Sequence, residues 1–100
     1  MRNLEAHTRL GPNEVIKRAL GFFGPGGLGL QIKQRQLTRV EFEGGGGGIT
    51  ISVLLDLERG GTVVEISERE WDRKVEDFLA SLPAQRSRWL QRLPVLGRFL

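Results

Sequence analysis

The sequence predicts an α+β fold, a two-layer sandwich in which two helices cover one face of an antiparallel sheet. Five short segments alternate apolar and polar residues, which is typical of strands that bury only one side. Two other segments, within 13–23 and 67–82, repeat apolar residues at helical spacing. Along the chain these segments give the order β-α-β-β-β-β-α, and such a sheet buries its apolar side by packing helices against it.

The length and composition predict one hydrophobic core. The chain has 100 residues, of which 39% are apolar and 27% charged, and this balance is typical of globular domains. It has no cysteine, which excludes disulfides, thiolate metal sites and a thiol nucleophile. Residues 1–5 lack the apolar stretch of a signal peptide, and no run reaches the roughly 18 apolar residues of a membrane-spanning helix. We therefore expect a cytoplasmic protein.

Charge divides the chain into an α+β domain, residues 1–83, and a basic amphipathic tail, residues 84–100. Residues 1–82 hold 11 basic side chains and all 12 acidic ones, whereas residues 83–100 add four arginines and no acid. The high isoelectric point therefore comes from the tail, and the charge of the whole chain does not indicate nucleic-acid binding.

The first strand and the first helix are predicted within residues 4–23. Residues 4–10 alternate, and Gly11 and Pro12 then break the strand. Asn13 is the predicted N-cap of a helix. The apolar face of that helix consists of Val15, Ile16, Ala19, Leu20 and Phe23. Glycine and proline at 24–27 end the helix.

Four more strands are predicted at 28–33, 39–43, 49–57 and 64–67. The glycine run 44–48 and Arg59-Gly60-Gly61 are the predicted hairpin turns.

The last helix is predicted from a capping box and an apolar stripe. Ser67 is the predicted N-cap and Glu70 stands three positions later. The stripe consists of Trp71, Val75, Phe78, Leu79 and Leu82, and Pro83 ends the helix.

In element order, over about residues 4–82, the chain resembles one repeat of the TATA-binding-protein-like fold. More loosely it resembles a shortened helix-grip domain of the kind that binds lipids and polyketides. No motif of either family is matched, so the resemblance implies a fold and assigns no functional residue.

Two glycine-rich segments were tested as ligand-binding loops. Residues 24–29 satisfy G-x-G-x-x-G, but a helix precedes them and a strand follows, the reverse of the dinucleotide-binding order, so we predict a helix stop. The run 44–48 has two interpretations: a loose, tolerant turn, or bare backbone that a ligand or partner approaches closely.

Few side chains are candidates for catalysis. His7 is the only histidine, and we interpret it as solvated or paired at the surface because no metal-ligand spacing accompanies it. Glu41, Glu43 and Glu65 share the polar face of the sheet, where acid–base chemistry competes with ordinary cross-strand pairing. We favour pairing with basic side chains, namely Lys33, Arg35 or Arg39.

We therefore predict no catalytic residue, no cofactor and no metal, and thus a protein that is not an enzyme. Nucleic acid is disfavoured, because the polar face of the predicted sheet offers no aromatic side chain for base stacking.

The tail is the predicted contact surface. Its composition, basic with tryptophan and leucine, is typical of an interfacial amphipathic segment. Its candidate partner or membrane contacts are Arg86, Arg88, Trp89, Leu90, Arg92, Leu93, Leu96, Phe99 and Leu100. Three interpretations stay open: the tail docks on its own domain or on a second copy, it contacts an anionic membrane or acidic partner, or it is a frayed end.

From these observations we predict a non-catalytic binding or interaction module. It would self-associate, with a homodimer as the simplest form, or hold a small apolar ligand between sheet and helix. The alternative is a peripheral membrane protein that is anchored by residues 84–100.

Overall fold

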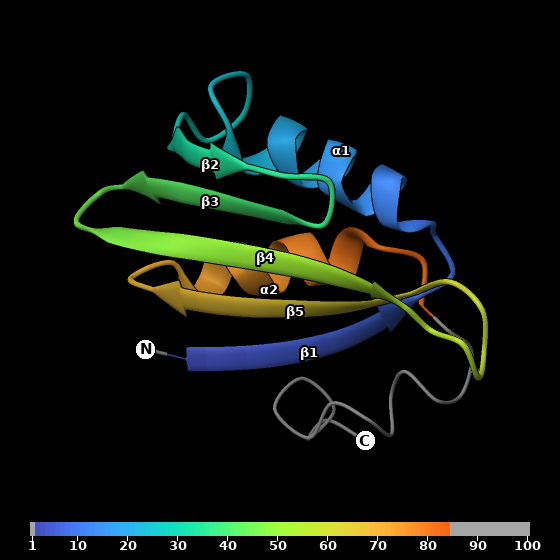
Figure 1. Cartoon of the computed structure of the whole chain (residues 1–100). Helices are drawn as coiled ribbons and strands as arrows, with labels where there is room; N and C mark the ends of the chain where they lie inside the picture. The colour runs from blue at the N-terminus through green and yellow to red at the C-terminus, as the bar shows by residue number, and fades with distance from the viewer. Residues whose placement is uncertain (1, 85–100) are drawn as a thin grey trace.

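A computed structural model, which describes residues 2–84, shows a five-stranded antiparallel sheet with two helices packed on one face (Figure 1). The elements are β1 (Arg2–Thr8), α1 (Pro12–Phe23), β2 (Gln31–Arg35), β3 (Arg39–Gly44), β4 (Gly47–Leu55), β5 (Thr62–Arg69) and α2 (Asp72–Ser81). The predicted α+β class and the order β-α-β-β-β-β-α are confirmed.

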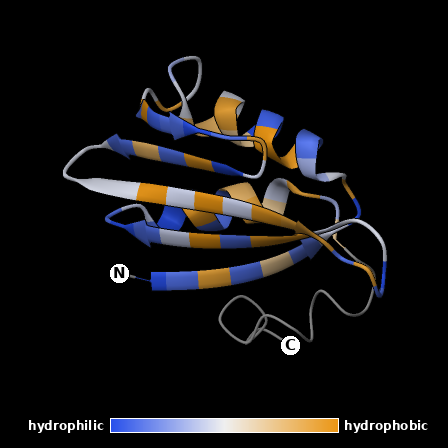
Figure 2. Ribbon diagram, in the orientation of Figure 1, coloured by the Kyte–Doolittle hydropathy of each residue, from blue (hydrophilic) through white to orange (hydrophobic). Residues whose placement is uncertain are grey.

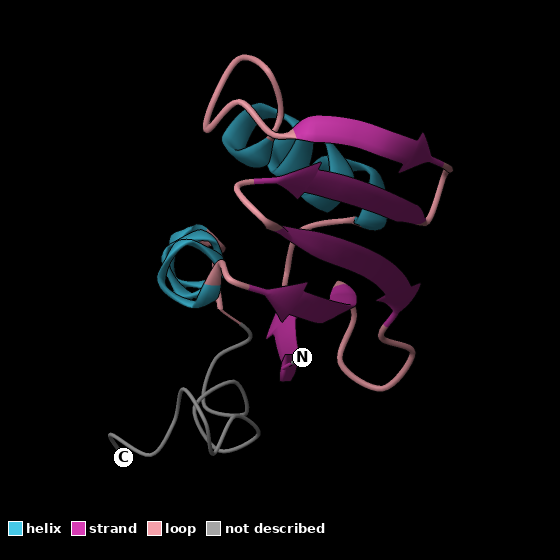
Figure 3. Cartoon of the chain, turned by 90° about the vertical axis from the view of Figure 1, so that its left-hand side faces the viewer, coloured by secondary structure: helices cyan, strands magenta, loops and turns pink. Residues whose placement is uncertain are grey.

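The strands lie in the order β1-β5-β4-β3-β2, so the first strand of the chain pairs with the last. Helix α1 packs against β3 and β4, and α2 packs against β5, so the two helices cover different parts of the sheet (Figure 3). Strands β1 and β2 are the edges. Pairing of His7 with Val63 and of Thr8 with Thr62 sets the end of β1 beside the loop that joins β4 to β5.

The hydrophobic core lies between the sheet and the helices, and the alternation along the strands follows it (Figure 2). On that side the buried apolar residues at alternate positions are Val40 and Phe42 in β3, Ile49, Ile51 and Val53 in β4, and Val64 and Ile66 in β5. Four phenylalanine rings fill the middle, with centroids 4.9–5.5 Å apart: Phe22, Phe23, Phe42 and Phe78. Of these, Phe23 and Phe78 belong to the predicted apolar faces of the two helices, and both are buried.

The predicted capping box is wrong. Strand β5 continues to Arg69, because Ser67 pairs with both neighbouring strands and donates to Asn3 at 2.6 Å. Glu70 then adopts a φ of 71°, and α2 begins two residues later, after Trp71. Helix α1 likewise begins at Pro12 rather than after Asn13, since proline is well suited to the first turn of a helix.

Several strand ends also differ from the prediction. β1 covers Arg2–Thr8 rather than residues 4–10. β2 begins at Gln31 rather than at residue 28, because the amides of the preceding residues bond back to the end of α1. β4 ends at Leu55, and the connection to β5 is a loop of residues 56–61 rather than a short turn.

The glycine run forms a tight, packed turn, so its interpretation as a loose turn is wrong. Gly45 and Gly46 have φ of 58° and 81°, as a two-residue hairpin turn requires. The Trp71 indole donates from Nε1 to the carbonyl of Gly44 at 3.0 Å, and its ring lies where a Cβ of Gly45 would be. A Cβ on Gly47 would lie only 2.0 Å from the Arg69 carbonyl oxygen. The close approach therefore comes from this chain's own β5–α2 connection.

Candidate functional site

The face of the sheet opposite the helices is open and polar. Cross-strand pairing places Glu5, Glu65, Ser52 and Arg39 in one row across β1, β5, β4 and β3. A neighbouring row contains Asn3, Ser67 and Thr50. Together these two rows line a shallow hollow of about 680 Å³. We call this surface the open-face hollow.

Two glutamates oppose each other in this hollow. Glu5 and Glu65 are directly paired residues on adjacent strands, an arrangement in which like charges destabilise a sheet. Glu5 contacts His7, whereas Glu65 makes no hydrogen bond or ion pair with any side chain in residues 2–84. The folded sheet therefore holds a negative charge that it does not neutralise within its described part.

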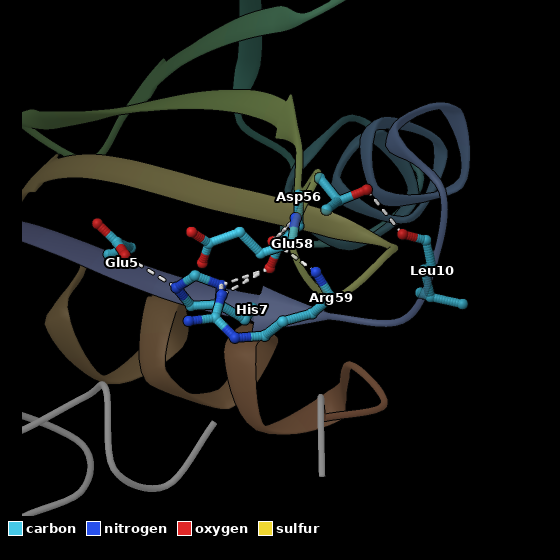
Figure 4. A network of polar contacts seen from close by, with 7 residues as sticks. Glu5, His7, Leu10, Asp56, Glu58 and Arg59 are labelled. Atoms are coloured by element: carbon cyan, nitrogen blue, oxygen red, sulfur yellow. Dashed lines mark hydrogen bonds and ion pairs between the residues drawn. The ribbon is translucent and has the colours of Figure 1, made fainter. Parts of the chain in front are cut away.

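His7 lies beside the hollow and is buried, with only 2% of its surface exposed. Its Nε2 is 2.9 Å from Glu5 Oε2, and its Nδ1 is 3.0 Å from Asp56 Oδ2 (Figure 4). The interpretation of His7 as solvated or paired at the surface is therefore wrong about its burial. Strand β1 supplies His7, and the loop after β4 folds across the sheet to supply Asp56.

Arg59 completes the group of four side chains that we call the His7 cluster: Glu5, His7, Asp56 and Arg59. Arg59 Nη1 is 2.9 Å from Asp56 Oδ2 and 3.1 Å from His7 Nδ1. A ring protonated on both nitrogens donates to both carboxylates, and Arg59 then donates to Asp56 and not to Nδ1. A neutral ring with its proton on Nε2 donates to Glu5 and accepts from Arg59 through Nδ1. In either form both ring nitrogens are hydrogen-bonded within the cluster.

Asp56 holds the loop of residues 56–61 in place. Its Oδ1 accepts from the backbone amides of Glu58 and Arg59 at 3.3 and 3.2 Å, while Oδ2 faces His7 and Arg59. The hydrogen bond to His7, followed by those from Arg59, holds the pKa of Asp56 well below its usual range. The carboxylate is therefore charged at neutral pH, and it ties the loop to the edge strand.

The His7 cluster has the residue types of an acid–base site, but its geometry is that of a structural contact that holds two segments of the chain together. Both ring nitrogens face carboxylates, so neither is directed at a hydroxyl that it could activate. The two carboxylates lie at opposite nitrogens, and the described residues contain no group of three side chains that could hold a metal ion. What the cluster does is fix Glu5 at the rim of the open-face hollow.

A second ionic group, the Glu68 cluster, lies on the helix side and consists of Arg2, Glu68, Asp72 and Glu76. Glu68 is 1% exposed, and its Oε1 accepts from Arg2 Nε at 3.3 Å. Arg2 also reaches Glu76 at 2.9 Å and the Asp72 carbonyl at 3.0 Å. Burial, and then the neighbouring Asp72 carboxyl, raise the pKa of Glu68. This cluster joins β1 and β5 to the start of α2.

The other predicted site residues have ordinary roles. Glu41 pairs with Arg39 of its own strand at 3.2 Å, and Glu43 pairs across to Lys33 at 3.5 Å, both on the exposed surface. The predicted pairing with basic side chains is therefore found for Glu41 and Glu43, but not for Glu65 within residues 2–84. In the segment 24–29, backbone amides donate to carbonyls at the end of α1, so that they are not directed at a ligand. The tail contacts predicted at residues 86–100 lie outside the described part of the chain.

Two other surfaces are apolar. Four leucines are exposed near one end of the sheet: Leu37, Leu54, Leu55 and Leu57. Between α1 and the turn after β2, Ile16, Leu20 and Leu37 line a second hollow of about 680 Å³, flanked by Lys17 and Arg35.

Comparison with known proteins gave no match to a family model, a curated protein or a solved structure. Neither of the two described helices has the length and apolar character needed to cross a bilayer.

Proposed function

We propose that this chain is a non-catalytic binding module whose open-face hollow takes an extended, basic stretch of polypeptide. The observation that supports this proposal is the opposition of Glu5 and Glu65 within one hollow. The other polar groups that line it are the hydroxyls of Thr50, Ser52 and Ser67, the amide of Asn3 and the guanidinium of Arg39. A cation placed between the two carboxylates turns a repulsive pair into two attractive ones.

The shape and chemistry of the hollow favour an arginine-containing ligand. A guanidinium group has five donors in a fixed plane and can serve two carboxylates at once. Ser52, Ser67 and Thr50 lie beside the glutamates and offer hydrogen bonds to a peptide backbone. Arg39, at the far end of the row, provides a donor for a carbonyl or carboxylate of the same ligand. The hollow is open to solvent, so we expect weak binding that depends strongly on salt.

The test is a titration with a labelled, end-capped peptide of sequence Arg-Ser-Arg-Ser-Arg, followed by fluorescence anisotropy. Glu65→Gln is expected to weaken binding about fivefold, which corresponds to about 1 kcal/mol. Glu14→Gln, the same change on the exposed side of α1, is the matched control and should leave the affinity unchanged. Equal binding of the peptide Glu-Ser-Glu-Ser-Glu, or equal affinities for the two variants, would contradict the proposal.

A second candidate function is the binding of a small apolar ligand with an acidic group in the hollow between α1 and β2. The observation that favours it is the apolar floor formed by Ile16 and Leu20, with Lys17 and Arg35 at the rim. Titration with decanoate, followed by calorimetry, tests this candidate. Leu20→Gln should abolish the signal, whereas decanol should bind more weakly than decanoate.

Membrane attachment through the tail, the alternative drawn from the sequence, concerns residues outside the described range. Cosedimentation with vesicles containing phosphatidylserine separates it from the peptide-binding proposal, because Glu65→Gln should not reduce attachment to an anionic membrane. A cytoplasmic location stays a prediction from the sequence.

A further inference from the structure

We infer that the chain carries its own ligand for the open-face hollow: the arginine-rich segment of residues 85–100 docks there and competes with external basic peptides. This inference rests on the proposed function and names one occupant of the same site. The observations that lead to it are where the described chain ends, which charges it has and what lies within reach.

The described chain ends beside the hollow. Ala84 forms an antiparallel bridge with Thr8, and the amide of Arg9 donates to the Pro83 carbonyl at 3.3 Å. Because Thr8 pairs with Thr62 on its other side, Ala84 lies at the outer edge of β1. Because the bridge is antiparallel, Pro83 and Ala84 run opposite to β1, in the direction that leads from Thr8 toward Glu5.

The distances allow the docking. Glu5 is three residues from Thr8, which corresponds to about 10 Å along a strand. The remaining 16 residues can extend over roughly 50 Å, so they can cross the whole sheet. A tether of this length gives an effective concentration on the order of 1 mM, well above the concentration of a second copy in dilute solution.

The charges and the apolar surface are complementary. Residues 85–100 contain four arginines and no acid, while the hollow holds the opposed Glu5 and Glu65. In the row next to the two glutamates, Val63 and the exposed Leu54 lie opposite each other on β5 and β4. They offer an apolar strip to the tail residues that lie between its arginines, such as Trp89 and Leu90.

The experiment compares two full-length chains, the wild type and a variant with Arg86→Gln, Arg88→Gln, Arg92→Gln and Arg98→Gln. Both are titrated with the Arg-Ser-Arg-Ser-Arg peptide. Release of the hollow from its internal competitor should raise the affinity of the variant about tenfold. Amide resonances of Ser52, Glu65 and Ser67 should shift between the two chains, whereas that of Glu14 on α1 should not.

The outcomes separate this inference from the proposed function. If both chains bind the peptide with equal affinity, the tail is not the occupant, and the proposed function stands. If neither chain binds it and the open-face resonances do not differ, both ideas are overturned. If light scattering shows a wild-type dimer that the four substitutions dissociate, the occupant is the tail of a second copy, and the intramolecular inference is overturned.

Discussion

The two connections at opposite ends of β4 are held in their conformations by different interactions. The β3–β4 turn is made almost entirely of glycine and is held by shape, with Trp71 above it and the Arg69 backbone beside it. The β4–β5 loop, residues 56–61, is held by charge through Asp56, Arg59 and His7. A turn held by shape should be insensitive to pH and salt, whereas a loop held by charge should respond to both. The loop held by charge, which is linked to Glu5 of the candidate site through His7, is thus the one whose stability should depend on pH and salt.

The largest effect is expected from Gly47→Ala, which tests the turn held by shape. The added Cβ would meet the Arg69 carbonyl oxygen at 2.0 Å, a backbone atom that cannot move without displacing β5. We expect a loss of about 3 kcal/mol in the free energy of unfolding, measured by urea denaturation. Gly21→Ala, at an exposed position within α1 with open space around it, should instead stabilise the protein by up to about 1 kcal/mol. Equal effects at the two positions would refute this account of the turn.

The second largest loss of stability is expected from Asp56→Asn, which tests the loop held by charge. The substitution keeps the size of the side chain but leaves His7 and Arg59 without their shared carboxylate. The urea midpoint should fall, by less than for Gly47→Ala. Glu58→Gln, two residues further in the same loop, is the control and should leave the midpoint within error. If Asp56→Asn behaves like Glu58→Gln, the cluster does not hold the loop.

Features of the fold that depend on contacts between neighbours in the sequence can be predicted from it, whereas features that depend on contacts between distant residues cannot. The alternation of β3 and β4 is local, and it predicts which side of the sheet is buried. The burial of His7 follows from a contact with a residue 49 positions away, which requires knowing that β1 pairs with β5. The glycine run was misinterpreted for the same reason, since Trp71 reaches Gly44 across 27 positions.

The predicted capping box failed for a physical reason that the sequence does contain. Ser67 and Glu70 have the right spacing for a helix start, but Thr62, Val64, Ile66 and Glu68 continue the period of two. Glu68 is polar yet takes a buried position, where it pairs with Arg2 on the neighbouring strand. A charged residue in a core phase therefore hides the continuation of the strand from a reading of the pattern alone.

The contributions of Asp56 and Glu68 to the free energy of unfolding should change with pH in opposite directions. Asp56 has a pKa lowered from its usual 3.8, so its contribution to stability is present above that value and is lost as the pH falls below it. Glu68 has a pKa raised from its usual 4.5, so its contribution is present below 4.5 and is lost as the pH rises through the raised value.

Glu68→Gln tests the expected direction in which the contribution of Glu68 to stability changes with pH. The amide stays uncharged at every pH, so at pH 7 the variant should match or exceed the wild type by up to about 1 kcal/mol. That difference should shrink as the pH is lowered toward 4, in urea unfolding at successive pH values. A variant that is clearly less stable than the wild type at pH 7 would show that the ion pair with Arg2 outweighs the burial of the charge.

The smallest change in the free energy of unfolding is expected from Glu65→Gln. Its sign depends on what occupies the open-face hollow. In the chain whose four tail arginines are glutamine, Glu65→Gln relieves the repulsion from Glu5 and should stabilise the fold by about 0.5 kcal/mol. In the wild-type chain the same change also removes a partner of the tail, so the gain should vanish or turn into a loss. The double-mutant cycle between Glu65 and the arginines isolates this coupling, which we expect to be about 0.5 kcal/mol and to disappear in high salt. A coupling of zero at low salt would mean that the charges of the tail and of the hollow do not meet, and that the opposed glutamates await a ligand from outside the chain.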